Sequence, residues 1–332
     1  MKPTAPTAPI WQRRQFVCAT LASAVAPQAF AQSDWPNRPV KLIVPSAAAG
    51  PTDAFARLYA DQLSKTFNQP FVVDNRAGAN GMIGNDQAAK ATPDGYTILF
   101  SYAAAIAVNP SLQAKMPYDT FKDLQPVTQV GGSGTLLAVA PDFPAKNFSD
   151  FVAHIKANPD KYNYGSWGVG SGGHLSMEFI KHAAGLKMNH VPYKSIPQII
   201  TDLLGGVLQV GFVDPFTSLP HIRAGKLRPI VISGTKRGPQ LPDVPTLTDV
   251  GHRFEADAWF GVFVPAQTPT AIVQRLNQEI NRISQLPEAR ARFTALNMPD
   301  SPIKTVEQFT QTIRGDVDTW SQIIRVNNIK AE

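Results

Sequence analysis

A glycine-rich segment is the part of this sequence best suited to holding a small anion. Residues 164–174 read Tyr-Gly-Ser-Trp-Gly-Val-Gly-Ser-Gly-Gly-His, with five glycines and two serines between an expected strand and an expected helix. Glycines leave peptide N–H groups accessible and serine hydroxyls add donors, so such a loop can surround a carboxylate or a phosphate. The candidate ligand-binding residues here are Ser166, Trp167, Gly168, Gly170, Ser171 and His174.

The same loop permits other interpretations. Gly168, Gly170 and Gly173 match the G-x-G-x-x-G pattern of dinucleotide-binding loops. The acidic ribose partner expected about twenty residues later is missing, because residues 187–194 contain no Asp or Glu. We therefore expect no cofactor. Three alternative interpretations stay open. The loop could be a tight turn without a ligand, Trp167 could pack inside the protein rather than stack on a ligand, and His174 could hydrogen-bond a backbone group.

A second candidate loop follows the first expected strand. Residues 45–53 read Pro-Ser-Ala-Ala-Ala-Gly-Pro-Thr-Asp, and Pro51 suits the first position of a helix. Small side chains let a ligand approach the N–H groups that a helix start leaves unpaired. The candidates are Ser46, Ala48, Ala49, Gly50, Thr52 and Asp53. Helix capping alone, with Asp53 favourable to the helix dipole, is the alternative.

A third candidate region contributes Tyr193 and Asp214. Tyr193 and Lys194 follow an expected strand, and Asp214 follows the next strand along the chain. Tyr193 and Lys194 could hydrogen-bond an acid. The alternative places Tyr193 at a packed edge and Lys194 in solvent.

Catalytic and metal-binding patterns are weak by comparison. The sequence contains no G-x-S-x-G elbow, H-E-x-x-H pair or P-loop lysine, and its six histidines show no metal-ligand spacing. We expect a binding protein without catalytic residues or a metal. A hydrolase triad of Ser166 or Ser171 with His174 and Asp214 is the enzymatic alternative, since triads assemble in space rather than in sequence.

Runs of β-branched residues alternate with amphipathic segments, which predicts an α/β fold of mostly parallel sheets flanked by helices. The absence of a Ser/Gly linker favours two lobes joined by crossing strands. Ligands in such folds bind at the carboxyl ends of strands, where the candidate loops lie. Expected strands cover 39–44, 71–73, 96–100, 135–139, 162–164, 190–193, 208–213, 227–233 and 259–264; expected helices cover 51–67, 83–91, 148–157, 175–184, 197–204, 216–224, 270–296 and 306–324.

Composition points to a small partner. The 332 residues carry 31 Lys plus Arg against 25 Asp plus Glu, a formal net charge of +6. No run of Lys and Arg exceeds two residues, so the clustered basic surface of a nucleic-acid-binding protein is missing. We expect no nucleic-acid partner.

The first residues have the order of a bacterial export signal. Arg13-Arg14 precede an apolar stretch at 16–26 and the sequence Ala29-Phe30-Ala31. We predict an export signal over residues 1–31, cleaved after Ala31 and of the twin-arginine type, with the general secretory route and an uncleaved anchor as alternatives. Cys18 is the single cysteine, so the mature chain would contain no disulfide.

Several motifs spread over the whole mature chain resemble the Bug-type family of extracytoplasmic solute receptors, the binding component of tripartite tricarboxylate transporters. They include Trp35-Pro36, Leu42–Pro45 leading to Gly50–Asp53 with Arg57, Val73–Gly81, Pro93–Thr97, Pro117–Asp119, Tyr164–Ser166 with Gly168, Gly170–Ser171 and His174-Leu175, His190–Lys194, Gly225–Arg228, Leu241–Thr246, Trp259 and Pro265–Pro269.

The resemblance implies a two-lobed, type II-like periplasmic-binding-protein fold. One lobe would comprise residues 32–135 with 256–332, and the other residues 136–255. A ligand would lie between the lobes, its carboxylates held by the loops at 46–53 and 166–171 through backbone amides, hydroxyls and water. Ser46, Ala49 and Ser195 depart from the family pattern, which usually has a bulky residue, Gly and Gly there.

The resemblance therefore implies a periplasmic receptor that captures a small organic carboxylate and delivers it to membrane transporter subunits. We expect a monomer that closes around its ligand by a hinge movement. A receptor that reports its ligand to a membrane signalling kinase is the alternative function.

Overall fold

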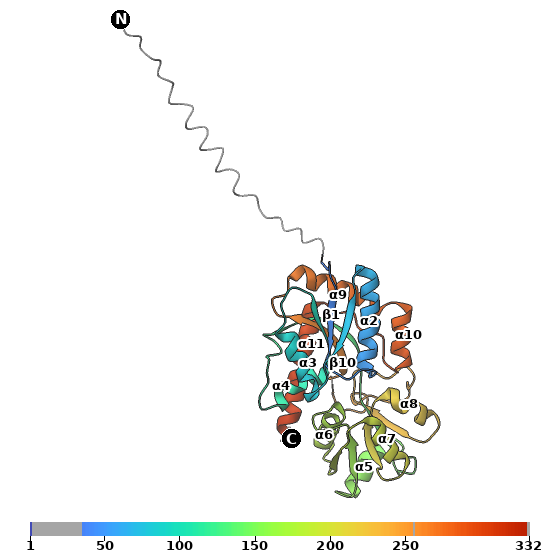
Figure 1. The fold of residues 1–332 in the computed structure, drawn as a ribbon. Helices are drawn as coiled ribbons and strands as arrows, with labels where there is room; N and C mark the ends of the chain where they lie inside the picture. The colour runs from blue at the N-terminus through green and yellow to red at the C-terminus, as the bar shows by residue number, and fades with distance from the viewer. Residues whose placement is uncertain (2–34, 255, 331–332) are drawn as a thin grey trace. The chain divides into compact units, whose positions relative to one another are not determined.

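The computed structural model describes residue 1, residues 35–254 and residues 256–330 (Figure 1). Every element below lies within residues 36–330. The predictions for Arg13, Arg14, Cys18 and Ala31 lie outside the described residues.

The first sheet has the strand order β2-β1-β3-β10-β4. Its strands are β1 (Val40–Val44), β2 (Phe71–Asn75), β3 (Thr97–Tyr102), β4 (Leu124–Ser133) and β10 (Ala258–Pro265). β1 pairs in parallel with β2 and β3, whereas β10 pairs antiparallel with β3 and β4. Four of the five β1 residues are buried, as expected for a strand covered on both faces.

The second sheet repeats this plan, with the order β7-β6-β8-β5-β9. Its strands are β5 (Leu136–Val139), β6 (Asn163–Ser166), β7 (Asn189–Pro192), β8 (Val210–Val213) and β9 (Arg228–Ile232). β6 pairs in parallel with β7 and β8, and β5 pairs antiparallel with β8 and β9.

The predicted α/β fold class is confirmed: in each sheet four of the five strands run in the same direction, and one strand, β10 or β5, runs against them. The antiparallel strands in the two sheets, β10 and β5, follow the crossings between the sheets: β5 begins directly after β4, and β10 brings the chain back after β9. The division at residues 135 and 255 stays a prediction.

The crossing segments touch through bare backbone. A Cβ atom added to Gly134 would lie 2.3 Å from the Gly234 nitrogen, and one added to Gly234 would lie 2.6 Å from the Gly134 nitrogen. Thr135 and Ser233 continue this contact, because Ser233 N–H donates to the Thr135 carbonyl at 2.8 Å.

Two sets of helices cover the sheets (Figure 1). Around the first sheet are α2 (Pro51–Phe67), α3 (Met82–Ala89), α9 (Thr270–Ser284), α10 (Pro287–Ala295) and α11 (Val306–Val326). Around the second are α5 (Phe148–Ala157), α6 (Gly172–Ala184), α7 (Ile196–Leu204) and α8 (Pro215–Arg223). α11 contacts β4 of the first sheet and also α6 beside the second. Among the described residues, no helix has the length and apolar character needed to cross a membrane.

Helix boundaries follow local signals. α2 begins at Pro51 and ends at Phe67, and the residue that caps its end, Asn68, has a left-handed φ of 50°. Asn147 caps α5 by accepting the Asp150 N–H. The single helix expected over 270–296 is wrong, because Pro287 starts a new helix, α10, after the end of α9.

Other elements escaped the sequence analysis. The strand β4 was not expected, although it forms the edge of the first sheet. A π-helix at Ala104–Val108 and the short helix α4 (Asn109–Leu112) follow β3 directly. Their residues Val108 and Leu112 pack into a core cluster with residues of the second sheet, such as Phe212.

Candidate functional site

A cavity of about 430 Å³ lies where elements of the two sheets face each other. We call it the cleft. It is lined by Ser46, Pro51, Thr52, Asn80, Tyr102, Ala103, Ala104, Val108, Trp167, Val169, Ser171, Gly172, Ile196, Asp257, Ala258, Trp259, Phe260 and Trp320. The starts of α2 and α6 both reach it, so two helix N-termini that belong to different sheets open on one space.

The start of α2 presents unpaired peptide N–H groups. Pro51 has no N–H, and the first bond of the helix runs from Ala54 N–H to the Gly50 carbonyl. In the described chain no side chain caps this helix, which leaves the amides of Thr52 and Asp53 without helical partners. Because Thr52 lines the cleft, an anion there would meet the positive end of the helix dipole.

Asp53 holds the preceding loop in shape. One carboxylate oxygen accepts the Ala49 N–H at 2.9 Å and the Arg57 Nε–H at 2.9 Å, and the other accepts the Asn75 amide at 3.0 Å. Burial alone would raise the pKa of Asp53, but the hydrogen bonds from Arg57 and Ala49 bring it below its usual value. Asp53 is therefore ionised and holds the loop in place through these hydrogen bonds. Ala49, which has a φ of 66°, donates its N–H to Asp53, so this amide is not available to a ligand.

The start of α6 is shaped by glycines. The Ser171 hydroxyl caps the helix by accepting the His174 N–H at 3.3 Å, and Gly172 lines the cleft. Gly170 has a φ of +74°, and a Cβ there would lie 2.1 Å from Leu112 Cδ2. A Cβ at Gly173 would lie 2.7 Å from both Phe212 and Trp167. The glycines thus allow the loop to pack closely on both sides.

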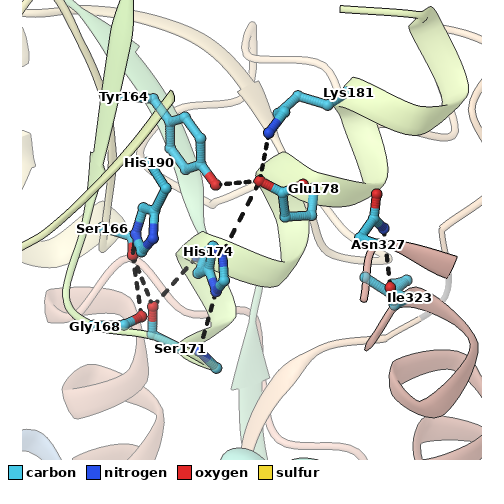
Figure 2. Close-up of polar contacts among 11 residues, drawn as sticks. Tyr164, Ser166, Gly168, Ser171, His174, Glu178, Lys181, His190, Ile323 and Asn327 are labelled. Atoms are coloured by element: carbon cyan, nitrogen blue, oxygen red, sulfur yellow. Dashed lines mark hydrogen bonds and ion pairs between the residues drawn. The ribbon is translucent and has the colours of Figure 1, made fainter. Parts of the chain in front are cut away.

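A polar network behind this loop fixes its conformation (Figure 2). Ser166 Oγ and His190 Nε2 are 2.7 Å apart, and Ser171 Oγ donates to Ser166 Oγ at 3.2 Å. His174 Nδ1 accepts the Gly170 N–H at 3.1 Å. The rings of His174 and His190 stack with centroids 4.0 Å apart.

The electrostatics of the network keep the imidazoles neutral. Burial lowers the pKa of His174, and burial together with His174 lowers the pKa of His190 to about 3. Tyr164 donates to Glu178 at 2.6 Å, and Lys181 pairs with the same carboxylate at 2.7 Å. Burial, with Glu178 nearby, raises the pKa of Tyr164. These side chains position the loop. Within the network Ser171 lines the cleft, whereas His174, His190, Tyr164, Glu178 and Lys181 do not.

Aromatic side chains form much of the cleft wall. Trp167 comes from the glycine-rich loop, Tyr102 from the end of β3, Trp259 and Phe260 from β10, and Trp320 from α11. The Trp259 indole donates to Asp316. Two buried polar atoms of the lining, Trp320 Nε1 and Ser46 Oγ, have no hydrogen-bond partner among the described residues.

A polar region adjoins the cleft at Asp257. Two cavities of about 250 and 300 Å³ share Gln129, Thr235, Asp257 and Lys304. Asp257 accepts the Thr235 N–H at 2.9 Å and its hydroxyl at 2.8 Å. Burial raises the pKa of Asp257 despite these bonds, and it lowers the pKa of Lys304. Asp257 therefore ties two crossing segments together at the edge of the cleft.

The structure brings only part of the predicted set to the cleft. Ser46, Thr52, Trp167 and Ser171 line it. The lining does not include Ala48, Ala49, Gly50, Asp53, Ser166, Gly168, Gly170, His174, Tyr193 or Asp214.

Two of these outlying residues have structural partners. Asp214 caps α8 by accepting the Thr217 N–H at 2.6 Å. Tyr193 donates to Asp202 at 2.7 Å.

Several lining residues were missed by the sequence analysis. Tyr102, Asp257, Phe260 and Trp320 come from strand ends and a helix far apart in the chain, and none belongs to a loop with a recognisable pattern. Trp259 belongs to an expected strand, and both Trp259 and Asn80 belong to motifs of the family resemblance, but neither is among the predicted binding residues. Asn80 has a φ of 48° in a turn between Gly78 and Gly81. These two glycines are the one local sequence signal beside a missed residue.

The described residues do not assemble the alternative hydrolase triad. Asp214 is engaged at the start of α8, while His174 Nδ1 accepts a backbone N–H. Ser166 is close to His190, but it is fully buried and does not line the cleft. The described residues also contain no group of three or more side chains suited to hold a metal ion.

Comparison with known proteins identifies the family. Residues 55–329 match the family model described as "Tripartite tricarboxylate transporter family receptor". The chain belongs to this family. It is 35% identical to BugT of Bordetella pertussis over 298 residues, covering 89% of this chain and 91% of BugT.

Solved structures of related receptors agree. Rpa4515 of R. palustris with adipate is 30% identical, with a TM-score of 0.77, and the match covers 90% of this chain and 99% of that one. MatC from Rhodopseudomonas palustris with bound malate is 28% identical, with a TM-score of 0.72, and covers 87% and 100%.

The predicted family and the two-lobed binding-protein fold are thus confirmed. This family consists of periplasmic solute-binding receptors, which implies a small-molecule ligand and a transporter partner.

Proposed function

We propose that this receptor captures a small organic carboxylate in the cleft and delivers it to the membrane subunits of a tripartite tricarboxylate transporter. The observation that carries the proposal is the meeting of the α2 and α6 N-termini on one cavity. The carboxylate ligands of Rpa4515 and MatC support the choice of an acid.

The electrostatics favour an ionised ligand. A helix N-terminus stabilises an anion by about 0.3–1 kcal/mol at an exposed site and up to about 2 kcal/mol where water is partly excluded. Two termini therefore contribute roughly 0.6–4 kcal/mol. Because they come from different sheets, an anion held by both favours the closed arrangement by its extra contacts there.

The test measures ligand-induced stabilisation. The mature chain is heated with mono-, di- and tricarboxylates, acidic amino acids and aromatic acids, and the solutions are then analysed for products. We expect at least one acid to raise the Tm and to be recovered unchanged. Absence of stabilisation by any acid, or formation of a product, would contradict the proposal.

Variants locate the binding. Ser171→Trp and Thr52→Trp place a bulky side chain at each helix start and should abolish the stabilisation. Ser149→Trp, at an exposed position in α5, is the matched control and should retain it. Equal binding by all three variants would place the ligand elsewhere.

The export route and assembly state are part of the same proposal. We expect residues 1–31 to direct export by the twin-arginine route, with cleavage after Ala31, and the mature receptor to be a monomer. N-terminal sequencing of the periplasmic protein, export in a strain lacking the twin-arginine translocase, and light scattering test these points.

A further inference from the structure

Two tryptophans of the cleft wall differ in how their indole N–H groups are satisfied. The Trp259 indole donates to Asp316 of α11. Trp320 follows four residues later on the same helix, and its Nε1 is buried without a hydrogen-bond partner among the described residues. Buried donors are nearly always paired in folded proteins. The unpaired indole therefore indicates an acceptor that this part of the chain does not itself supply.

Packing holds the Trp320 ring in place. The side chain is only 4% exposed, and it makes an edge contact with Phe254 at 5.5 Å between ring centroids. It also belongs to the core cluster that contains Ile323 and Ile324 of the same helix. A ring packed in this way cannot turn its N–H toward bulk water. Because Trp320 also lines the cleft, the donor is preorganised beside the space that a solute would occupy.

A second unpaired polar group comes from the loop before α2. Ser46 lines the cleft, and its Oγ is buried without a partner among the residues that the structure describes. The Ser46 carbonyl accepts the Asn75 side-chain amide at 3.1 Å, which fixes the backbone of the loop at this point. An indole N–H and a hydroxyl both donate hydrogen bonds without carrying charge. They can therefore bind a carboxylate oxygen or an uncharged oxygen.

We propose that Trp320 Nε1, assisted by Ser46 Oγ, donates a hydrogen bond to the solute and thereby selects acids that carry a second oxygen acceptor. The first carboxylate meets the α2 and α6 termini, and a second carboxylate or a hydroxyl accepts from the indole. An acid without this second oxygen leaves the buried donor unpaired and binds more weakly. This inference rests on the proposed function, which it deepens by assigning a specificity-determining residue to the cleft.

Titration calorimetry on the mature chain tests the preference with acids of equal chain length. Succinate and malate are each compared with butyrate, and adipate is compared with hexanoate. The members of each pair share one carboxylate and differ in the second oxygen group. We expect the acid that binds most tightly among succinate, malate and adipate to exceed its monocarboxylate partner by about tenfold or more, as for a hydrogen bond to a charged group.

Variants separate a hydrogen bond from a structural role. Trp320→Phe removes the N–H and keeps an aromatic ring, so it should weaken the preferred acid by about tenfold and its monocarboxylate partner by less than about twofold. Structural damage to the cleft would weaken both acids equally, and the unliganded Tm is measured alongside. Ser46→Ala should weaken the preferred acid by about threefold. Ser149→Ala, at an exposed position in α5, is the control and should change neither affinity.

A spectroscopic signature identifies the donor directly. In the ¹⁵N-labelled mature chain, the indole resonance that is missing from Trp320→Phe belongs to Trp320. Saturation with the preferred acid should move this resonance downfield, because its N–H gains an acceptor. The Trp259 indole, which already donates to Asp316, should move less.

The outcomes separate this inference from the proposed function. An unmoved Trp320 resonance at saturation, equal losses for both acids in Trp320→Phe, or monocarboxylates that bind as tightly as their partners would overturn the inference and leave the carboxylate function standing. Failure of every acid in the wider panel to bind would overturn both.

Discussion

The close approach of Gly170 to Leu112 gives a sharp prediction for Gly170→Ala. The glycine has a φ of +74°, and an added methyl group would lie 2.1 Å from Leu112 Cδ2. Gly170 belongs to the loop after β6 of the second sheet, and Leu112 ends α4, which follows β3 of the first. The substitution therefore strains both the backbone and a contact between the two halves of the fold.

A matched control variant separates the two contributions to the loss of stability, backbone strain and overpacking. Gly185 ends α6 with a φ of +66°, and a Cβ there would meet no atom within 4 Å. Gly185→Ala should cost only the left-handed backbone penalty, about 1–2 kcal/mol. Gly170→Ala adds overpacking, about 1–3 kcal/mol. We expect its unfolding free energy to fall by about 2–5 kcal/mol in total.

Urea denaturation and calorimetry with the best carboxylate form the assay. Leu112→Ala alone should cost about 2–5 kcal/mol, but in the Gly170→Ala background it should cost at least about 1 kcal/mol less, because it removes the clashing methyl groups. Opening of the cleft would also relieve the clash, so Gly170→Ala should weaken ligand binding by about 5- to 150-fold.

The refuting result is equally specific. If Gly170→Ala and Gly185→Ala differ by less than about 0.5 kcal/mol, or if Leu112→Ala brings no relief, the contact is not the constraint that the structure indicates.

Three further predictions concern the groups that shape the two loops. Asp53→Asn should lower stability by about 1–3 kcal/mol at neutral pH, since it weakens hydrogen bonds to a charged group. The folded-state pKa of Asp53 lies below the ordinary value of 3.8. The contribution of Asp53 to wild-type stability should therefore be complete above pH 3.8 and be lost as the pH falls through the folded-state pKa. In urea titrations the variant should show less of this decline. His190 has a folded-state pKa of about 3 against 6.5 in the unfolded chain, so its contribution to stability is present above pH 6.5 and is lost as the pH falls toward 3. His190→Asn should flatten that part of the profile; an unchanged slope would show that the imidazole is protonated in the folded state. Ser171→Ala should cost about 1 kcal/mol through loss of the α6 cap, and Ser171→Thr, which keeps a hydroxyl, should recover most of it in the same urea assay.

Much of the fold follows from local sequence signals. The bounds of α2 and α5 match the prediction at both ends, because Pro51 and the capping Asn147 mark their starts. β4 was missed because Pro126, Gly131 and Gly132 interrupt a strand whose pairing with β10 compensates for them. Such compensation is a long-range effect that a short sequence window does not contain.

Only part of the site could be predicted from the sequence in this way. The small residues before α2 and α6 could be found because a helix start has a local pattern. The aromatic wall could not, since Tyr102, Phe260 and Trp320 become neighbours only through the crossing of the chain. The sequence also could not tell that Asp53 faces Ala49 and Arg57 rather than a ligand, because both roles suit an acid in the first turn of a helix.

The backbone contact between Gly134 and Gly234 has a consequence for mutational tolerance. Both positions are buried. A Cβ atom at either glycine would clash with the main-chain nitrogen of the other. A saturation library selected for ligand uptake should therefore reject every replacement at these two sites, whichever solute is supplied. Specificity could be evolved along the aromatic wall while this pair of glycines stays invariant.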